Sequence, residues 1–184
     1  LKQNGIIWRC LVRADLTVKY GHDFIDMMID SGCVGVGMGV ESGSAKILRI
    51  INKGETVAHM RTAVQMLKSH GLFVKGFFIV GLPGESEETL AKTDEFLREV
   101  QLDDIDCKIY QPYPASPIYN NREQYDIQWD ATPLEYSFYK GVPGEYYGNV
   151  STSSLSSERI VEWWKYFEDT YKDWTFAIEG KMTQ

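Results

Sequence analysis

Cysteines are few in this sequence, and none of the three lies close to another. Cys10, Cys33 and Cys107 are too far apart for the short spacing of a zinc or iron–sulfur loop. Each lies in or beside an apolar segment that we expect to be a strand, where a free cysteine behaves as a small buried hydrophobe. The spacing excludes a local metal loop, and three core residues are favoured over a disulfide with a spare thiol.

Long apolar runs and an excess of basic residues are also missing. No run approaches the ~18 residues of a membrane span, and the N-terminus lacks the pattern of a signal peptide. We therefore expect a soluble, cytoplasmic protein without a membrane partner. Lys and Arg number 19 against 26 Asp and Glu, for a net charge of -7, so we expect no nucleic-acid partner, although a local basic groove is compatible with this balance.

What the sequence does have is an alternation of strand and helix patterns, which predicts an α/β fold built from parallel βα units. Helices are expected at residues 22–31, in two stretches after residue 40, and from Ser86 onward. Thr56 is the expected N-cap of the second stretch, which ends at Gly71. Four strands are expected, at residues 6–12, 33–40, 72–80 and 105–111.

Four strands are too few to close a barrel, so we expect an open sheet or a partial (βα) TIM-like barrel with outer helices. The chain opens at Leu1, a few positions before the first strand and without an initiator methionine, which we interpret as a fragment of a longer chain. An unpaired edge on that strand predicts a homodimer or another form of edge coverage.

The character of the sequence changes near residue 120, which divides the chain into a partial barrel at 1–120 and an aromatic-rich C-terminal extension at 121–184. Residues 151–157 are polar and are interpreted as a flexible linker. The helical stripe that follows lines a substrate channel, binds a partner or packs on the domain, and we favour packing. Its members are Ile160, Trp164, Phe167, Tyr171 and Trp174.

Ligands of parallel α/β folds bind beyond the C-terminal ends of the strands. At residues 39–44 a buried strand ends in Glu41, Ser42 and Ser44 between glycines. A carboxylate with neighbouring hydroxyls can bind a pair of ribose hydroxyls or balance a positive charge. Equally, Glu41 can stabilise a tight turn while Ser42 or Ser44 caps the next helix.

A second strand end, at residues 77–85, is apolar and runs into a Gly-Leu-Pro-Gly turn. Such an edge suits a purine ring, which needs stacking surface and main-chain hydrogen bonds, although a plain strand-to-helix turn explains it equally well. Glu85, Glu87 and Glu88 disfavour a phosphate at this helix start. A ligand with a purine, a ribose and a positive centre fits both ends, and S-adenosylmethionine (SAM) is such a molecule.

Several segments of the sequence resemble a known protein family. The segments at 39–44, 47–48, 52–56 and 79–86, in this order, are similar to the middle of radical SAM proteins, especially the Elongator-like, methylthiolating and cobalamin-dependent members. Residues 111–119 are similar to the sixth-strand segment of that group, which often has Gly-Thr where this chain has Ala115 and Ser116. The resemblance covers residues 7–120 and implies that the four strands are barrel strands three to six.

The resemblance also implies roles for single residues. Glu41 and Ser42, with Ser44 beside them, would contact the ribose or the amino-acid part of SAM. Arg13, at the end of the third barrel strand, is a candidate for the methionine carboxylate, and a surface ion pair with Asp15 is the alternative.

The adenine would lie against the fifth barrel strand, at Ile79 and Gly81. Glu85 is not assigned the role of the family's acid, because the turn is one residue longer here than in the family's shorter form. The sixth barrel strand would border the adenine with Gln111, Pro112 and Tyr113.

The family's Cys-x-x-x-Cys-x-x-Cys loop and the glycine-rich segment after its second strand are not in this sequence. The resemblance implies a parent enzyme that reduces SAM through a 4Fe-4S cluster, so that a 5'-deoxyadenosyl radical abstracts a substrate hydrogen. A cobalamin cofactor is compatible with the parent. For this chain itself we expect no cluster, no bound iron, no catalytic residue and weak SAM affinity.

Two other functions remain open. One is a degenerate, non-catalytic (βα) module that binds a nucleotide-like ligand or a partner. The other is a conventional barrel lyase or aldolase with a reactive lysine, for which Lys75 and Lys108 are the only lysines on the expected strands.

Overall fold

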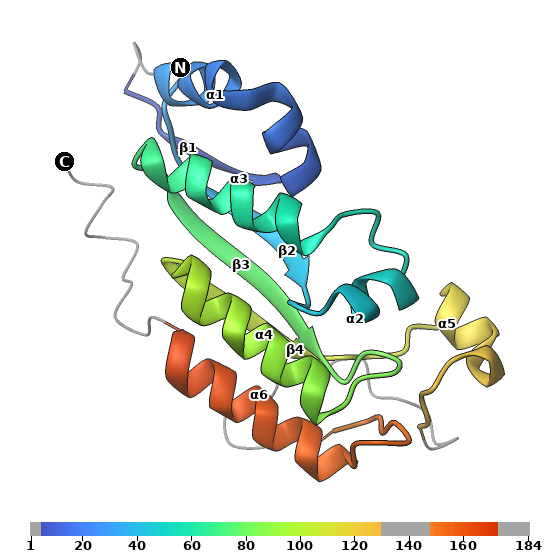
Figure 1. Cartoon of the computed structure of the whole chain (residues 1–184). Helices are drawn as coiled ribbons and strands as arrows, with labels where there is room; N and C mark the ends of the chain where they lie inside the picture. The colour runs from blue at the N-terminus through green and yellow to red at the C-terminus, as the bar shows by residue number, and fades with distance from the viewer. Residues whose placement is uncertain (1–4, 130–147, 173–184) are drawn as a thin grey trace.

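A computed structural model describes residues 5–129 and 148–172. Four parallel strands form one sheet in the order β1-β2-β3-β4 (Figure 1). They are β1 (Trp8–Val12), β2 (Cys33–Glu41), β3 (Phe73–Val80) and β4 (Asp104–Ile109). Each strand pairs with the next one along the chain, as repeated βα units require. The α/β class and the four parallel strands of the prediction are confirmed.

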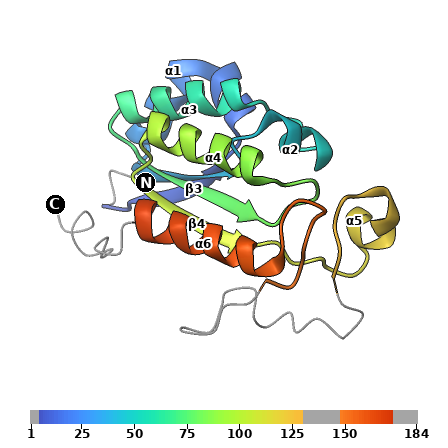
Figure 2. The ribbon, with the colours of Figure 1, turned by 60° about the horizontal axis from the view of Figure 1, so that its bottom comes forward.

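Helices cover one face of this sheet (Figure 2). They are α1 (Ala14–Asp30), α3 (Val57–Ser69) and α4 (Glu87–Val100), while the short α2 (Ala45–Ile50) follows β2. The core between these layers includes Met38, Met60 and Phe78, all nearly or fully buried. Because β-strand side chains alternate between the two faces of a sheet, every second side chain of a strand points toward these helices.

The opposite face of β1, β2 and β3, here called the open face, carries Leu11, Gly37 and Phe77. A Cβ added at Gly37 would lie 2.6 Å from the Phe77 ring and 2.8 Å from the Leu11 side chain, so the three share one face. No helix of the described chain shields Leu11, which is 77% exposed. One face is thus packed and the other is accessible, as in one side of an unclosed barrel.

The first helix is longer than predicted. Sequence periodicity predicted only residues 22–31, but α1 begins at Ala14 and continues through a kink at Gly21, where φ is 72° and ψ is -163°. Glycine adopts this conformation without a Cβ clash. The prediction missed the first turns because the residues that they bury, Ala14 and Thr17, are small or polar and so show no strong apolar periodicity.

The caps of the later helices agree with the sequence. The Thr56 side chain accepts a hydrogen bond from the His59 amide at the start of α3. At the start of α4, Ser86 and Thr89 form a reciprocal capping box. These local signals depend on residues three positions apart, which is why the sequence alone located both helix starts.

The C-terminal extension packs on β4. After α5 (Pro117–Asn120) and the 3-10 helix η2 (Arg122–Gln124), helix α6 (Ser157–Tyr171) lies along β4 (Figures 1 and 2). Its Trp164 ring nitrogen donates to the Cys107 carbonyl at 2.9 Å, and Glu168 accepts from the Cys107 amide at 2.9 Å. Both polar groups of this edge residue are therefore satisfied, which blocks further strand pairing there.

The aromatic stripe of α6 faces the domain, as favoured from the sequence: Ile160 and Phe167 are fully buried. Trp174, the last member of the predicted stripe, lies outside the described residues. The interpretation of residues 151–157 as a flexible linker was wrong. The hydroxyl of Thr152 donates to the Glu85 carbonyl at 2.8 Å, and Leu155 is buried, so tertiary contacts fix a segment whose polarity suggested mobility.

The three cysteines are free, and all are at least partly buried. Burial raises the pKa of Cys10 to about 11 and that of Cys107 well above its ordinary value. Within the described residues, no three His, Cys, Asp or Glu side chains form a metal-binding group, and none of the helices could span a bilayer.

Candidate cofactor-binding site

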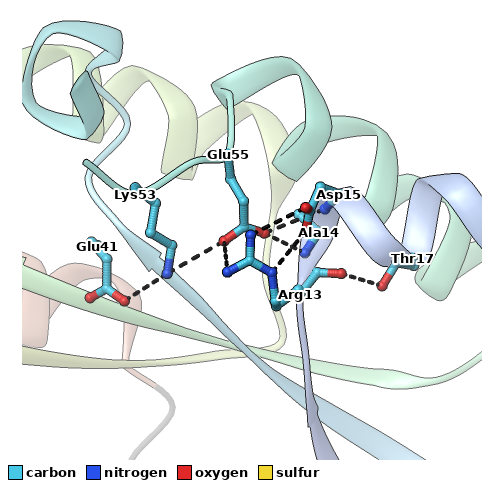
Figure 3. A network of polar contacts seen from close by, with 7 residues as sticks. All are labelled: Arg13, Ala14, Asp15, Thr17, Glu41, Lys53 and Glu55. Atoms are coloured by element: carbon cyan, nitrogen blue, oxygen red, sulfur yellow. Dashed lines mark hydrogen bonds and ion pairs between the residues drawn. The ribbon is translucent and has the colours of Figure 1, made fainter. Parts of the chain in front are cut away.

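An ion pair between Glu41 and Lys53 marks the C-terminal end of β2 (Figure 3). Glu41 is the last residue of the strand, has a φ of 63°, and follows a register shift opposite β3. Its Oε1 atom lies 3.0 Å from Lys53 Nζ. A Cβ added at Gly39 would lie 2.8 Å from that oxygen and 3.0 Å from Lys53 Nζ. The pair therefore lies over Gly39, where only glycine leaves room for it.

Glu55 extends this network toward β1. Its side chain is 1% exposed, and its Oε1 atom accepts a hydrogen bond from the Ala14 amide at 2.7 Å. Its Oε2 atom lies 3.5 Å from Lys53 Nζ. The carboxylate thus occupies the N-terminal end of α1, where orphan amides and the helix dipole favour a negative charge.

Arg13 completes the network at the end of β1. Its guanidinium donates to Asp15 at 3.0 Å and lies 3.9 Å from Glu55 Oε2. The hydrogen bond from Arg13 lowers the pKa of Asp15, and the same bond raises the pKa of Arg13. The ion pair with Asp15, which the sequence suggested as the alternative role for Arg13, is present. The Arg13 side chain is about half exposed, at 51%.

Together these residues place two cations and three carboxylates at the C-terminal ends of β1 and β2. Lys53 and Arg13 can bind a carboxylate, and Glu41 can bind an ammonium group or hydroxyls. Such a mixed arrangement suits a zwitterion better than an anion. Lys53 and Glu55 were not among the predicted site residues, although they belong to the 52–56 segment that carried the family resemblance.

Ser42 and Ser44 lie in the interior of the β2–α2 loop. The hydroxyl of Ser42 pairs with that of Thr93 on α4 at 3.2 Å and accepts from the Ser44 amide at 3.1 Å. The Ser44 hydroxyl is buried and has no hydrogen-bond partner. A Cβ at Gly43 would lie 2.7 Å from the Thr93 Cα. The two sides of this loop thus differ, because Glu41 faces Lys53 while Ser42 bonds α4.

The end of β3 is closed by a buried carboxyl group. Glu85 is fully buried and accepts hydrogen bonds from the amides of Gly81 at 2.6 Å and Leu82 at 3.2 Å. Burial raises its pKa to about 8, against the lowering effect of the two amides. Glu85 therefore stabilises the turn, which is the alternative that the sequence left open at this strand end.

Gly81 has a φ of 83°, and a Cβ there would lie 3.1 Å from Val150 and 3.2 Å from Ile160. The extension therefore packs against this glycine. Ile79, two residues earlier, is only partly buried and so offers apolar surface.

Gln111, Pro112 and Tyr113 follow β4. Gln111 is 7% exposed, and its Oε1 atom accepts a hydrogen bond from Asn149 Nδ2 at 2.6 Å. Pro112 is buried, whereas Tyr113 is 45% exposed. The three residues lie at the same edge of the sheet as Glu41, because all four strands are parallel.

Neither strand lysine is a free amine. Lys75 Nζ lies 2.8 Å from Asp104, and Lys108 Nζ lies 2.5 Å from Asp106. A neighbouring carboxylate favours the charged ammonium form, which is not nucleophilic. The geometry disfavours a lysine-dependent lyase or aldolase.

The cysteines do not fit an iron–sulfur cluster. Each lies inside a different strand, on β1, β2 and β4, and Cys107 is fully buried under α6. A cluster needs thiolates from one loop or from converging side chains at an accessible edge. The cysteines of this chain therefore provide no cluster site.

Comparisons with known proteins agree with these features. The radical SAM superfamily model matches residues 4–97, slightly more than half of the chain. An uncharacterized methyltransferase of Pyrococcus horikoshii is 32% identical over 121 residues, which are 65% of this chain and 26% of that protein. The tRNA-2-methylthio-N(6)-dimethylallyladenosine synthase of Baumannia cicadellinicola is 32% identical over 107 residues, covering 56% of this chain and 24% of that enzyme. The chain thus spans about a quarter of the length of these relatives.

A solved structure shares the fold. Coproporphyrinogen III oxidase of Escherichia coli, a radical SAM enzyme, superposes with a TM-score of 0.61 over 88% of this chain and 31% of that one, at 15% identity. This likeness supports the partial-barrel prediction for the sheet and its outer helices. From the matching model, the strand order and the relatives together, this chain belongs to the radical SAM superfamily.

Proposed function

We propose that this chain supplies the SAM-binding strands of a radical SAM enzyme. The observation that carries the proposal is the Lys53 network, which joins Glu41, Glu55 and Arg13 at the C-terminal ends of β1 and β2. Buried or half-buried opposite charges at a strand end are typical of ligand sites, and the superfamily supplies SAM as the ligand.

In this proposal the two cations bind the methionine carboxylate. Lys53 is held by Glu41 and Glu55. Arg13 leaves Asp15 and binds the methionine carboxylate from the end of β1. Glu41 then binds the ammonium group or the ribose hydroxyls, and the partly buried Ile79 contacts the adenine. Ser42 and Ser44 support the loop that carries Glu41, and Gly81 shapes the turn after Ile79.

The cluster-binding cysteines belong, in the same proposal, to another segment of the enzyme. When bound, a 4Fe-4S cluster supplies the electron that cleaves the sulfonium bond of SAM. The residues of this chain bind and orient SAM and, with the apolar side chains of the open face, exclude water from its reactive end. A cobalamin cofactor in the enzyme stays a prediction from the resemblance.

The test is a calorimetric or NMR titration of this chain with SAM. Without cluster ligands we expect a dissociation constant of about 1 mM. Replacing Lys53→Met removes the central cation and lowers the affinity about tenfold. Lys92→Met, which removes an exposed lysine paired with Glu88, is the matched control and should leave the affinity unchanged. Equal affinities of the two variants, or no saturable binding by the original chain, would contradict the proposal.

A further inference from the structure

Two histidines meet on the helical layer, where α1 and α3 pack side by side (Figure 1). His22 lies on α1 just after the kink at Gly21, and His70 is the C-cap of α3. Their rings are stacked with centroids 4.9 Å apart, and His22 Nδ1 lies 3.4 Å from His70 Nε2. Asp26, one turn after His22, places its Oδ1 atom 3.4 Å from the same nitrogen of His70. Two imidazole rings and a carboxylate therefore converge, although the two histidines are 48 residues apart in the sequence.

The His70 ring has one nitrogen occupied and the other directed at this cluster. Its Nδ1 atom lies 2.8 Å from the Met66 carbonyl oxygen, which can only accept, so Nδ1 carries a proton and donates to that oxygen. In the neutral ring the lone pair is then on Nε2, which faces His22 and Asp26. Metal-binding histidines commonly donate their other ring N–H to a backbone carbonyl, because this bond fixes the tautomer and the ring orientation. His70 therefore has the tautomer and the support of a metal ligand.

The surroundings of Nε2 require a positive charge. A nitrogen lone pair and the Asp26 carboxylate repel each other unless a cation lies between them, and the last carbonyls of α3 add the negative end of a helix dipole. A proton or a metal ion could supply this charge. A hydrogen bond would bring its two atoms to about 3 Å, closer than either contact of Nε2. Two nitrogens bound to a tetrahedral ion at about 2.0–2.1 Å lie about 3.4 Å apart, which is the separation of the two ring nitrogens.

We propose that His22 Nδ1 and His70 Nε2 bind a divalent transition-metal ion of the zinc class, and that Asp26 accepts a hydrogen bond from a water on that ion. Imidazole nitrogens suit Zn²⁺, Ni²⁺ and Cu²⁺. In the described part of the chain no three His, Cys, Asp or Glu side chains form a metal-binding group, so water fills the remaining positions of the ion. The exposed His22 ring turns from its stacked orientation until both lone pairs point at the metal.

This metal site is separate from the proposed SAM site. Lys53 and Glu55 precede the start of α3, whereas His70 follows its end, and the 13 residues of the helix span about 20 Å. The ion would join the part of α1 beyond Gly21 to the C-terminal end of α3 and so stabilise the helical layer. Metal binding at His70 and SAM binding at Lys53 can therefore fail independently of each other.

The first experiment is a calorimetric titration of the chain with ZnCl₂ near neutral pH. We expect saturable binding with a dissociation constant of about 10 µM. His22→Gln should weaken it about tenfold, because one of the two nitrogen ligands is lost. His59→Gln is the matched control, since His59 is the third histidine of the chain and lies in the first turn of α3. No saturable binding by the original chain, or equal affinities of the two variants, would overturn the proposal.

The second experiment identifies the ligand atoms by NMR. Long-range ¹H–¹⁵N spectra of the labelled chain report the ring nitrogens of each histidine. Zn²⁺ should shift His22 Nδ1 and His70 Nε2 and leave the His59 ring unchanged. Binding that shifts neither the His22 ring nor the His70 ring would assign the ion to other groups, such as the cysteines, and contradict the site.

The third experiment tests Asp26. Asp26→Asn keeps the shape of the side chain but removes its charge, so the affinity for Zn²⁺ should fall about threefold. Asp23→Asn, at another exposed position of α1, should leave the affinity unchanged. Equal affinities of these two variants would contradict the role of Asp26.

The fourth experiment measures the link between the helices. At about 0.1 mM Zn²⁺ the melting temperature of the original chain should rise by about 4 °C, because the ion binds the folded state alone. His70→Gln should show no such rise, and its melting curve without metal shows whether this variant is folded. An equal rise in folded His70→Gln would mean that the stabilising ion is bound elsewhere and would refute the proposed site.

Discussion

Two carboxylates follow neighbouring strands of the same sheet, and their surroundings give them opposite roles. Glu41 ends β2, lies against Lys53 and is partly exposed. Glu85 follows β3, is fully buried and bonds two backbone amides. An acidic residue after a strand is therefore not by itself a ligand group. The groups around each carboxylate differ: Glu41 is paired with the side chain of Lys53, whereas both hydrogen bonds to Glu85 come from backbone amides of its own turn.

The same contrast holds for the glycines before them. A side chain at Gly39 would collide with the ends of Glu41 and Lys53, whereas one at Gly81 would meet the packed side chains of Val150 and Ile160. The first glycine leaves room for a polar network, and the second allows the extension to close over the turn. The β2 end therefore carries a side-chain ion pair, and the β3 end carries a packed turn.

The largest expected effect is on the pH dependence of stability through Glu85. Its pKa is about 8 in the folded chain and near 4.5 when unfolded, so the folded state binds more protons between these values. The contribution of Glu85 to stability is highest below the unfolded pKa and falls as pH rises toward 8, by up to about 4 kcal/mol. Urea denaturation at several pH values should show this decline in the original chain and a much flatter profile in Glu85→Gln.

The exposed Glu88→Gln should keep the decline and serves as the control for removing a carboxylate from the same turn region. A profile that is equally steep in Glu85→Gln would show that other groups cause the pH dependence. The burial of Glu85 at the β3 end would then not distinguish it from Glu41 at the β2 end in its effect on stability.

Gly81→Ala should have the next largest effect. Its positive φ disfavours any side chain, and the new methyl group would lie within 3.1 Å of Val150. We expect about 2 kcal/mol lower stability in urea denaturation. Gly71→Ala is the control, because Gly71 has a φ of 74° and open space around it. This variant measures the cost of the backbone conformation alone and should lower the free energy of unfolding by only about 1 kcal/mol. Equal losses would mean that the extension does not press on the turn.

Glu55→Gln is expected to lower stability by about 1 kcal/mol, because it removes the charge that caps α1 and balances Lys53. Glu99→Gln, on an exposed pair with Arg61, should change stability far less. The comparison is made by chemical denaturation at pH 7. Equal stabilities of the two variants would show that Glu55 does not stabilise the fold through Lys53 and the start of α1.

Gly39→Ala should affect stability least. The atoms that the methyl group meets are the flexible ends of Glu41 and Lys53, which can move aside, so the loss should stay below about 0.5 kcal/mol. Because the ion pair is displaced, SAM affinity should still fall about threefold. A titration that shows unchanged affinity would mean that the Glu41–Lys53 pair is not part of the SAM site. Gly39 would then, like Gly81, have no role in ligand binding.

Local patterns predicted much of this molecule. The four strands, the Thr56 and Ser86 caps and the inward face of α6 all depend on neighbouring residues, and the sequence located them. The start of α1 was missed because its cap, Glu55, is 41 residues away from Ala14.

The candidate site was predicted less completely. Arg13 and Glu41 were selected from their places at strand ends, but Lys53 joins them only through tertiary packing. Nothing in the local pattern distinguished the buried Glu85 from the ion-paired Glu41, nor linked Gln111 to Asn149. Such distinctions depend on which segments cover a strand end, and the extension beyond residue 120 shows no repeat from which its position could be inferred.

The most direct test of the account is an NMR titration of the 15N-labelled chain with SAM. We expect the largest amide shifts at residues 39–41 and 53–55 and at Arg13, with little change on the helix-covered side of α1 and α3. Lys53→Met should remove these shifts while the amide of Gly81, bonded to Glu85, keeps its position. Shifts confined to other surfaces, or unaltered by Lys53→Met, would contradict the assignment of SAM binding to the β2 end.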